Sequence, residues 1–298
     1  MHIMSEYFTT RELAALLRIK ERKVYDLVSE KAVPVRRVTG KLLFPKKEIE
    51  EWIAGGSVGG TIATGAPPPT LPLIISGGHD PLLEWALRES RCGIAALLDG
   101  ALDGLERMKT HGCLAAGLHV PMEDPSEWNI GAVREAFATE PVVLVEWARR
   151  NRGLMYRPTI RKPIRKLADL GDLRFQARQP EAGSELILSA LLANESLERS
   201  DLNIVEAIER TETDLAMAVA GGRADVGLGI EAVAQSLQLG FTPLVVERFD
   251  LLVWRKTWFD PPFQKFIGFC NSEAFRERAR RFGGYDCAGF GTVHFNGP

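Results

Sequence analysis

The apolar positions near the N-terminus repeat at helical spacing. Thr9-Thr10-Arg11-Glu12 precedes the first of them and places a threonine three residues before a glutamate. A capping box of this kind opens a helix. The pattern predicts a short helix there and a second one over residues 21–30, with a tight turn over residues 18–20 between them. The apolar positions of the first helix are Leu13, Leu16 and Leu17, and the inner face of the second carries Val24, Leu27 and Val28.

The pattern changes at residues 34–44, where two short β-prone runs flank the turn Thr39-Gly40-Lys41. These runs predict a hairpin. Pro45 then begins a third amphipathic helix. The order helix, turn, helix, hairpin and helix predicts a winged helix-turn-helix over residues 1–54.

A segment without charge follows at residues 55–70, with the sequence GGSVGGTIATGAPPPT. Its glycines and serine favour flexibility, and the proline triplet stiffens its end. We expect a linker here, which separates a domain at residues 1–54 from a larger one at residues 71–298.

In residues 71–298, apolar runs alternate with helical periods. The runs that predict strands are 73–76, 94–98, 115–120, 142–145, 174–177, 226–228 and 251–254. The helical periods between them include 81–89, 102–109, 186–193 and 215–221. Such alternation is typical of parallel α/β sheets, and a segment of this length is sufficient for two lobes.

Composition narrows the class of protein. Hydrophobic residues make up 45% of the chain and charged residues 26%, as in ordinary globular proteins. No uncharged apolar stretch is long enough to span a membrane, and the N-terminus lacks the apolar core of a signal peptide. We therefore expect a cytoplasmic protein with no membrane partner. The four cysteines form no Cys-x-x-Cys pair, which argues against a zinc site.

Charge is divided unevenly between the two predicted domains. Residues 1–54 hold 11 Lys and Arg against 8 Asp and Glu, whereas the remainder holds 26 against 31. In a winged helix-turn-helix the second helix enters the major groove and the wing contacts the backbone or the minor groove. The candidate contacts to double-stranded DNA are Thr10, Lys20, Arg22, Lys23, Tyr25, Arg36, Arg37 and Lys41. For each residue alone, a solvated basic face remains the alternative.

The segment YFTTRELAALLRIKERKVYDLVSEKAVPVRRVTGKLLFPKKEIEEWI closely resembles the excisionase-type helix-turn-helix, a relative of the mercury-resistance regulator class. The resemblance covers the opening Thr-x-x-Glu-Leu-Ala, the Val-Tyr of the second helix, the hairpin with its glycine and the closing Ile-x-x-Trp-Ile. It implies DNA binding through the second helix and the wing. It also implies a homodimer or homotetramer that binds repeated half-sites.

The rest of the chain resembles the periplasmic-binding-protein-like domain of bacterial regulators and of some molybdopterin-related proteins. The matching stretches include GGHDPLLEWAL, DGALDGLERM, AAGLHVP, RQPEAGSELIL and AGGRADVGLGIEAVAQ. The resemblance implies a two-lobed α/β domain of type II, whose lobes close on a ligand. The chain would cross between the lobes near residues 142–149 and 245–255.

In that fold, strand-to-helix loops line the cleft and direct free N–H groups at the ligand. His79 is the candidate histidine contact, because it stands beside a predicted helix cap, whereas Asp225 begins a buried strand and more often holds structure. The candidate ligand-binding residues are Gly78, His79, Asp80, Gly100, Ala101, Glu181, Gly183, Ser184, Glu185, Glu212, Asp214 and Asp225.

Relatives of this domain are often linked to molybdate or tungstate, and converging helix N-termini suit an oxyanion. This chain departs from the family pattern at two helix starts. Glu181-Ala182-Gly183-Ser184-Glu185 replaces an expected Gly-Ser-Gly-Thr-Arg, and Thr211-Glu212 replaces an expected Thr-His. With Asp214, these carboxylates would repel a dianion. Two interpretations stay open: the acids occupy first helical turns and face solvent, or the cleft is adapted to a cationic, amine-bearing or metal ligand.

Together these patterns predict a one-component transcription regulator with a DNA-binding head and a sensor for a small-molecule, oxyanion or metal effector. No catalytic motif or Cys/His pair at a telling spacing is present, so we do not expect an enzyme. Two alternatives remain. One is an enzyme or binding protein of molybdate or molybdopterin metabolism, and the other is an architectural excisionase-like DNA binder.

Overall fold

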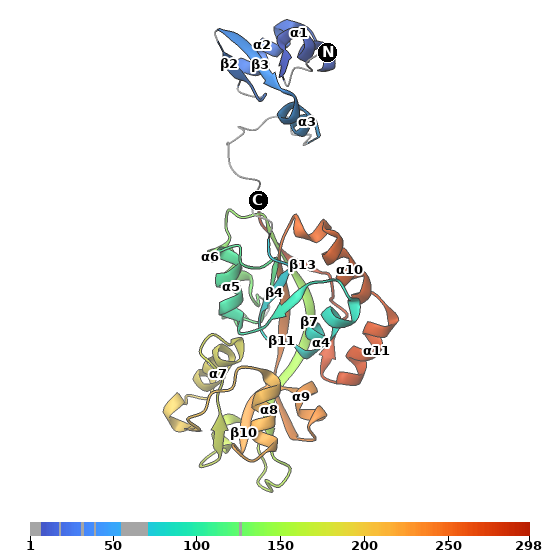
Figure 1. Cartoon of the computed structure of the whole chain (residues 1–298). Coiled ribbons are helices and arrows are strands. Elements are labelled where there is room, and N and C mark those ends of the chain that lie inside the picture. Colours follow the sequence, from blue (N-terminus) through green and yellow to red (C-terminus); the bar gives the residue numbers. More distant parts are fainter. Residues whose placement is uncertain (1–6, 18, 31–32, 39, 55–70, 125–126) are drawn as a thin grey trace. The chain divides into compact units, whose positions relative to one another are not determined.

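The computed structural model describes residues 7–17, 19–30, 33–38, 40–54, 71–124 and 127–298. The chain divides into two compact units, Met1–Thr70 and Leu71–Pro298 (Figure 1). The predicted linker at residues 55–70 lies outside the described residues. Each unit is described by itself below.

The first unit contains the helices and the hairpin that the sequence predicts. The helices are α1 (Thr10–Leu17), α2 (Glu21–Ser29) and α3 (Lys46–Ala54), and the hairpin strands are β2 (Arg36–Val38) and β3 (Lys41–Pro45). The predicted capping box is present, because the backbone N–H of Thr9 donates to Glu12 Oε2 at 2.8 Å and the N–H of Glu12 donates to Thr9 Oγ1 at 3.3 Å. One strand was not predicted: β1 (Tyr7–Thr9) pairs with β3 and gives the sheet order β1-β3-β2.

The small core of this unit explains why so short a segment folds. Leu13, Val24, Phe44 and Ile49 are fully buried, and they come from α1, α2, β3 and α3 respectively. Every helix and the central strand therefore contribute to one cluster. Burial of about four large apolar side chains contributes roughly 1.5–3 kcal/mol each.

The second unit has two lobes. Lobe 1 contains the strands β4 (Ile74–Gly77), β5 (Ala95–Leu97), β6 (Ala115–Leu118) and β13 (Val293–Asn296) and the helices α4 (Pro81–Ser90), α5 (Ala101–Lys109), α6 (Ile130–Ala136), α10 (Pro261–Cys270) and α11 (Glu273–Phe282). Lobe 2 contains β8 (Arg174–Gln176), β9 (Asn203–Ile204), β10 (Val226–Ile230), α7 (Gly183–Asn194), α8 (Glu212–Ala220) and α9 (Glu231–Ser236). The 3-10 turns are η1 (Leu167–Asp169), η2 (Arg199–Asp201) and η3 (Thr257–Phe259).

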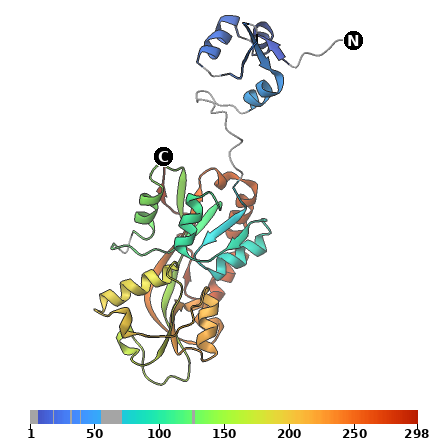
Figure 2. The same cartoon turned by 60° about the vertical axis from the view of Figure 1, so that its left-hand side comes forward.

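Two long strands join the lobes, and we call them the hinge strands. They are β7 (Val142–Tyr156) and β11 (Gly240–Trp254), each 15 residues long, and Figures 1 and 2 show both passing from one lobe into the other. They pair antiparallel from Gly240–Tyr156 to Trp254–Val142, with register shifts at Pro243–Val245 and Phe249–Asp250. The predicted crossings were placed near the lobe 1 ends of these strands, whereas the strands continue well into lobe 2.

The sheet is mixed, which corrects the expectation of parallel sheets. Among the described residues, ten strands form one sheet whose main path is β5-β4-β6-β11-β7-β10-β8-β9, with β12 (Tyr285–Asp286) and β13 also paired to β7. The outer strands of each lobe pair parallel, whereas every pairing made by the hinge strands is antiparallel. The chain returns from lobe 2 in the opposite direction, so antiparallel pairing at the hinge follows from the double crossing.

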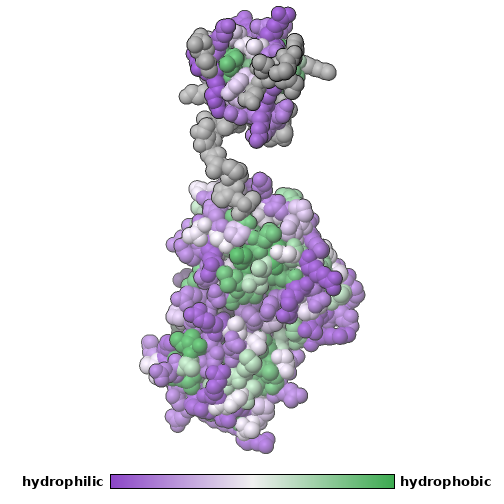
Figure 3. Space-filling model, in the orientation of Figure 1, coloured by the Kyte–Doolittle hydropathy of each residue, from purple (hydrophilic) through white to green (hydrophobic). Residues whose placement is uncertain are grey.

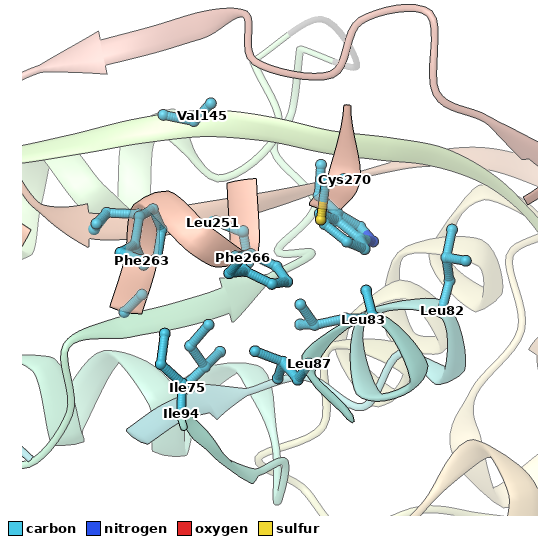
Figure 4. Packing of buried hydrophobic residues seen from close by; sticks show 14 of the residues in the cluster. Ile75, Leu82, Leu83, Leu87, Ile94, Val145, Leu251, Phe263, Phe266 and Cys270 are labelled. Carbon is cyan, nitrogen blue, oxygen red and sulfur yellow. The ribbon is translucent and has the colours of Figure 1, made fainter. Parts of the chain in front are cut away.

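Apolar clusters cover both faces of the sheet in each lobe. In lobe 1, α4, α10 and α11 pack on one face around Leu83, Phe263 and Phe266 (Figure 4), and α5 and α6 pack on the other. In lobe 2, α7 covers one face and α8 with α9 the other. On the side shown in Figure 3, hydrophilic residues predominate and hydrophobic ones gather in separate patches. None of the described helices is long and apolar enough to cross a bilayer.

The lobe 1 cluster gives a direct test of the packing. Phe266 is fully buried and stacks on Trp147 at a centroid distance of 5.8 Å, so Phe266→Ala should leave a cavity and lower the free energy of unfolding by about 3–5 kcal/mol. Phe259 is 74% exposed, so Phe259→Ala should change the free energy of unfolding by less than about 0.5 kcal/mol. Urea unfolding of the full chain measures both, and equal effects would contradict this packing.

Candidate functional site

Charged residues on the hinge strands face one another where the chain passes between the lobes. Arg150 and Arg152 are two residues apart on β7 and therefore lie on the same face of the strand. Glu247 on β11 stands directly opposite Arg150 in the register of the two strands. All three side chains have no exposed surface.

The Glu247 carboxylate is the centre of these contacts. Arg150 Nη2 lies 2.5 Å from Oε1, and Arg152 donates from Nε to Oε2 at 2.8 Å and from Nη2 to Oε1 at 3.0 Å. His119, which follows β6, approaches Oε2 with Nδ1 at 3.0 Å. Burial raises the pKa of Glu247, but the two arginines outweigh it and hold the pKa well below its ordinary value. The carboxylate is therefore ionised.

Lobe 1 contributes a second buried carboxylate. Asp80 caps α4 by accepting from the N–H of Leu83 at 2.6 Å, as the sequence Asp80-Pro81 predicts. The same side chain accepts from Arg150 Nη1 at 2.7 Å and from the Tyr285 hydroxyl at 2.6 Å. The start of α4 is thus bound directly to a hinge strand.

Lobe 2 contributes the third carboxylate. Glu212 is the first residue of α8, and its Oε1 accepts from Arg152 Nη2 at 2.8 Å and from Arg178 Nη1 at 3.1 Å. Arg178 lies just after β8. Burial raises the pKa of Glu212, but the opposing effect of Arg152 and Arg178 is larger. The net result is a pKa of about 2. We call the residues Asp80, His119, Arg150, Arg152, Arg178, Glu212 and Glu247 the hinge network.

The hinge network carries no net charge. Its three arginines stay protonated, and its three carboxylates are each bound to at least one of them. Burial lowers the pKa of His119, so the ring is neutral and its Nδ1–H donates to Glu247. A balanced network is the arrangement that tolerates burial, because an unpaired buried ion would be costly.

The lobes also meet through their loops. The N–H of Leu102 in lobe 1 donates to the carbonyl of Glu181 in lobe 2 at 3.1 Å, and the Gln179 side-chain amide donates to the carbonyl of Asp99. Gly183, the first residue of α7, lies so close to His119 that an added Cβ would be 2.7 Å from the ring. The structure therefore shows the lobes in a closed arrangement.

The predicted ligand-binding residues fall into two groups. Most are brought together at the junction of the lobes, and Asp214 is half-buried in the first turn of α8. The residues at the junction are Gly78, His79, Asp80, Gly100, Ala101, Glu181, Gly183, Ser184, Glu185 and Glu212. Asp225 lies apart from them. It stands just before β10, at the end of that strand remote from the hinge, where it accepts from Arg157 and Arg174. This placement agrees with its structural interpretation.

Two of the candidate acids, Glu185 and Glu212, fit neither interpretation that the sequence left open. Glu185 and Glu212 do occupy first helical turns, but they are buried rather than facing solvent. Nor are they free to hold a cation, since Glu185 lies 2.5 Å from Arg199 and Glu212 is bound by two arginines. No group of three metal-ligating side chains occurs within the described ranges. Only Glu181 is exposed.

The sequence analysis missed the arginines that pair with these acids, namely Arg152, Arg178 and Arg199. It also missed Arg150, Glu247 and His119, which complete the hinge network. A signal existed for two of them. Residues 146–152, EWARRNR, place arginines at alternate positions, which is the spacing of one strand face. The strand was not predicted here because this stretch is polar, whereas a buried strand is usually a run of apolar residues.

The first unit presents most of its predicted DNA contacts to solvent. Lys20, Arg22, Lys23 and Tyr25 lie at or within the first two turns of α2 and are exposed. Arg36, Arg37 and Lys41 are exposed on the hairpin, and Arg36 pairs with Glu48 at 2.7 Å. Thr10 is half-buried at the start of α1.

The hinge network predicts a specific pH dependence. The depressed pKa of Glu212 stabilises the fold above about pH 5, and this contribution is lost as the pH falls towards about 2. Glu212→Gln should lower the free energy of unfolding at pH 7 by about 3–5 kcal/mol, since two arginines lose their partner, and the gap to wild type should narrow at acid pH. Urea unfolding from pH 7 to pH 3 measures this. A gap independent of pH would contradict it, and the exposed Glu135→Gln on α6 serves as the control.

Comparisons with known proteins agree with this architecture. The family model of the PBP superfamily domain matches residues 84–271, and that of a helix-turn-helix domain matches residues 7–57. The uncharacterized protein YvgK of Bacillus subtilis (strain 168) is 23% identical over 300 residues, covering 96% of this chain and 97% of that protein.

Solved structures show likeness of fold alone. A putative phosphate ABC transporter substrate-binding protein from Clostridium perfringens matches with a TM-score of 0.51 and 13% identity, over 70% of this chain and 96% of that one. The tungstate ABC transporter structure from Geobacter sulfurreducens matches with a TM-score of 0.49 and 12% identity, over 68% and 95%. With the family match covering more than half of its length, this chain belongs to the PBP superfamily and carries an excisionase-type helix-turn-helix domain at its N-terminal end.

Proposed function

We propose that this protein is a transcription regulator that binds double-stranded DNA through its first unit and a small effector between the lobes of its second. One observation carries the proposal: a single chain joins a helix-turn-helix with an exposed basic second helix to a two-lobed domain whose lobes meet across a hinge. No reaction is assigned to the chain.

The hinge strands give the effector a physical route to act. Each lobe supplies one carboxylate to the arginines of the hinge strand β7: Asp80 of lobe 1 pairs with Arg150, and Glu212 of lobe 2 pairs with Arg152. An effector that prefers closed lobes shifts the population towards that state by its difference in affinity for the two states. In a homodimer, which the excisionase-type domain favours, such a shift changes the relation between two DNA-binding heads and hence the half-site spacing they fit.

A comparison of DNA affinity with and without effector tests the proposal. DNA that the full chain selects from a random pool serves as the target, and the small-molecule fraction of a bacterial extract serves as the probe. We expect the fraction to change the affinity by about fivefold or more, which corresponds to the lower range of coupling between sites. Unchanged DNA affinity with every fraction would contradict the proposal.

The DNA-binding surface makes a separate prediction. Lys23 is exposed near the start of α2, so Lys23→Ala should weaken binding to the selected DNA by about fivefold and reduce the slope of log affinity against log salt by about one. Lys47 is equally exposed but lies on α3, so Lys47→Ala should change neither quantity. Fluorescence anisotropy at several salt concentrations measures both, and equal effects of the two substitutions would place the DNA elsewhere on this unit.

A further inference from the structure

Four helices that start near the junction of the lobes, α4, α5, α7 and α8, carry an acid at the N-cap or in the first turn. Asp80 caps α4, and Glu185 and Glu212 lie in the first turns of α7 and α8. On α5 the corresponding residue is Asp103, which pairs with Arg107 at 2.7 Å. The partial positive charge of a helix N-terminus attracts an anion, and a carboxylate in the first turn offsets it. These helix starts therefore have little attraction left for an anionic ligand.

The arginines at the junction are also occupied. Arg150 and Arg152 share Glu247, and Arg152 and Arg178 share Glu212. An oxyanion that entered here would bring negative charge into a buried group whose charges already balance. It would lose its hydration without gaining an unpaired cation, which makes its binding unfavourable. The same balance disfavours a cation, because each carboxylate is bound to an arginine.

The hinge network leaves hydrogen-bonding atoms unpaired on side chains whose charges already cancel. Among the described residues, buried polar atoms without a hydrogen-bond partner include both donors and acceptors. The donors are Arg152 Nη1 and Arg178 Nε, the acceptors are Gln179 Oε1 and Glu212 Oε2, and Ser184 Oγ can act as either. Buried polar atoms are usually satisfied, so these donors and acceptors are available to a ligand that offers both kinds of hydrogen bond.

Two of these side chains lie where the lobes meet. Gln179 is 5% exposed, and its amide nitrogen already donates to the carbonyl of Asp99 in lobe 1. Ser184 is 1% exposed and follows Gly183, which abuts His119 of lobe 1. The unpaired Ser184 hydroxyl is thus next to an inter-lobe contact, at the N-terminus of the twelve-residue helix α7.

We propose that the effector is a small organic molecule with no net charge, either uncharged or zwitterionic, that both donates and accepts hydrogen bonds. This inference rests on the proposed function and specifies the chemical class of the effector that binds between the lobes. Its polar groups bind to Ser184, Gln179, Arg152 and Arg178. The arginines and carboxylates of the hinge network neutralise one another, so no net charge is left to attract an oxyanion, a polyamine or a metal ion. Hydrogen bonds rather than charge then set the specificity.

Two experiments test the inference: titration with defined small ions, and identification of the molecule that stays bound to the protein during gel filtration. Calorimetric titration of the full chain with molybdate, phosphate and putrescine should show no binding. Incubation with the small-molecule fraction of a bacterial extract, followed by gel filtration and mass spectrometry, should recover a molecule without net charge at pH 7. Micromolar binding of molybdate, phosphate or putrescine would overturn the inference, and so would recovery of an anion or a cation.

A pair of serine variants tests the contact itself. Ser184→Ala removes the unpaired hydroxyl and should weaken binding of the recovered molecule by about tenfold without lowering the melting temperature. Ser189 lies further along α7, where its hydroxyl donates to the carbonyl of Glu185, so Ser189→Ala should leave that affinity unchanged. Equal affinities of the two variants would overturn the assigned contact.

The outcomes separate this inference from the proposed function. A charged molecule that alters DNA affinity would overturn the neutral class of ligand and leave a ligand-responsive regulator intact. If the extract yields no bound molecule and no change in DNA affinity, both proposals fail.

Discussion

The Glu247 carboxylate, buried between Arg150 and Arg152, is the interaction on which the second unit depends. It lies on a strand pair that belongs to both lobes, and it is contacted by two guanidinium groups and the His119 ring. Two arginines cannot be neutralised by one carboxylate, so the remaining charge must come from elsewhere. Asp80 of lobe 1 and Glu212 of lobe 2 supply the further negative charges. Arg178 supplies the third positive charge by pairing with Glu212, so three arginines balance three carboxylates. Charge balance thus requires residues from three parts of the chain to meet.

This requirement links the fold to its proposed use. Asp80 holds the start of α4 and also accepts from Trp147, which lies in the lobe 1 core against Phe266. A change of angle between the lobes would therefore disturb both a helix cap and a charge pair. Glu212 makes the corresponding connection at the start of α8. Buried ion pairs add little net stability on their own, but their strength depends strongly on geometry, so these pairs favour the arrangement of the lobes described here.

Local signals made the first unit predictable. The capping box at Thr9 and Glu12, the apolar spacing of α1 and α2 and the glycine turn of the hairpin all lie within a few residues of the structure they specify. Only β1 was missed, because three residues carry too little pattern. The alternation of strands and helices in the second unit was equally visible. The meeting of its loops between the lobes was implied by the family resemblance and not by local pattern.

The hinge was not predictable from local pattern. The strand β7 was expected to end at Val145 because Glu146 and three arginines follow. Arg150 and Arg152 are tolerated inside the sheet only by partners distant in sequence. Glu212 looked like an unpaired acid for the same reason, since Arg152 is 60 residues away. Asp225, a candidate for the cleft, instead binds Arg157 and Arg174 at the far end of lobe 2. Long-range charge pairing was the missing information.

A double-mutant cycle between Arg152 and Glu212 tests the central claim most directly. The free energy of unfolding is measured for wild type, Arg152→Met, Glu212→Gln and the double variant at pH 7. Because each single variant leaves buried charge unpaired, we predict that the double variant is destabilised by less than the sum of the two, with a coupling energy above about 1 kcal/mol. A coupling energy near zero would contradict the account, because the two charges would then not depend on each other across the hinge.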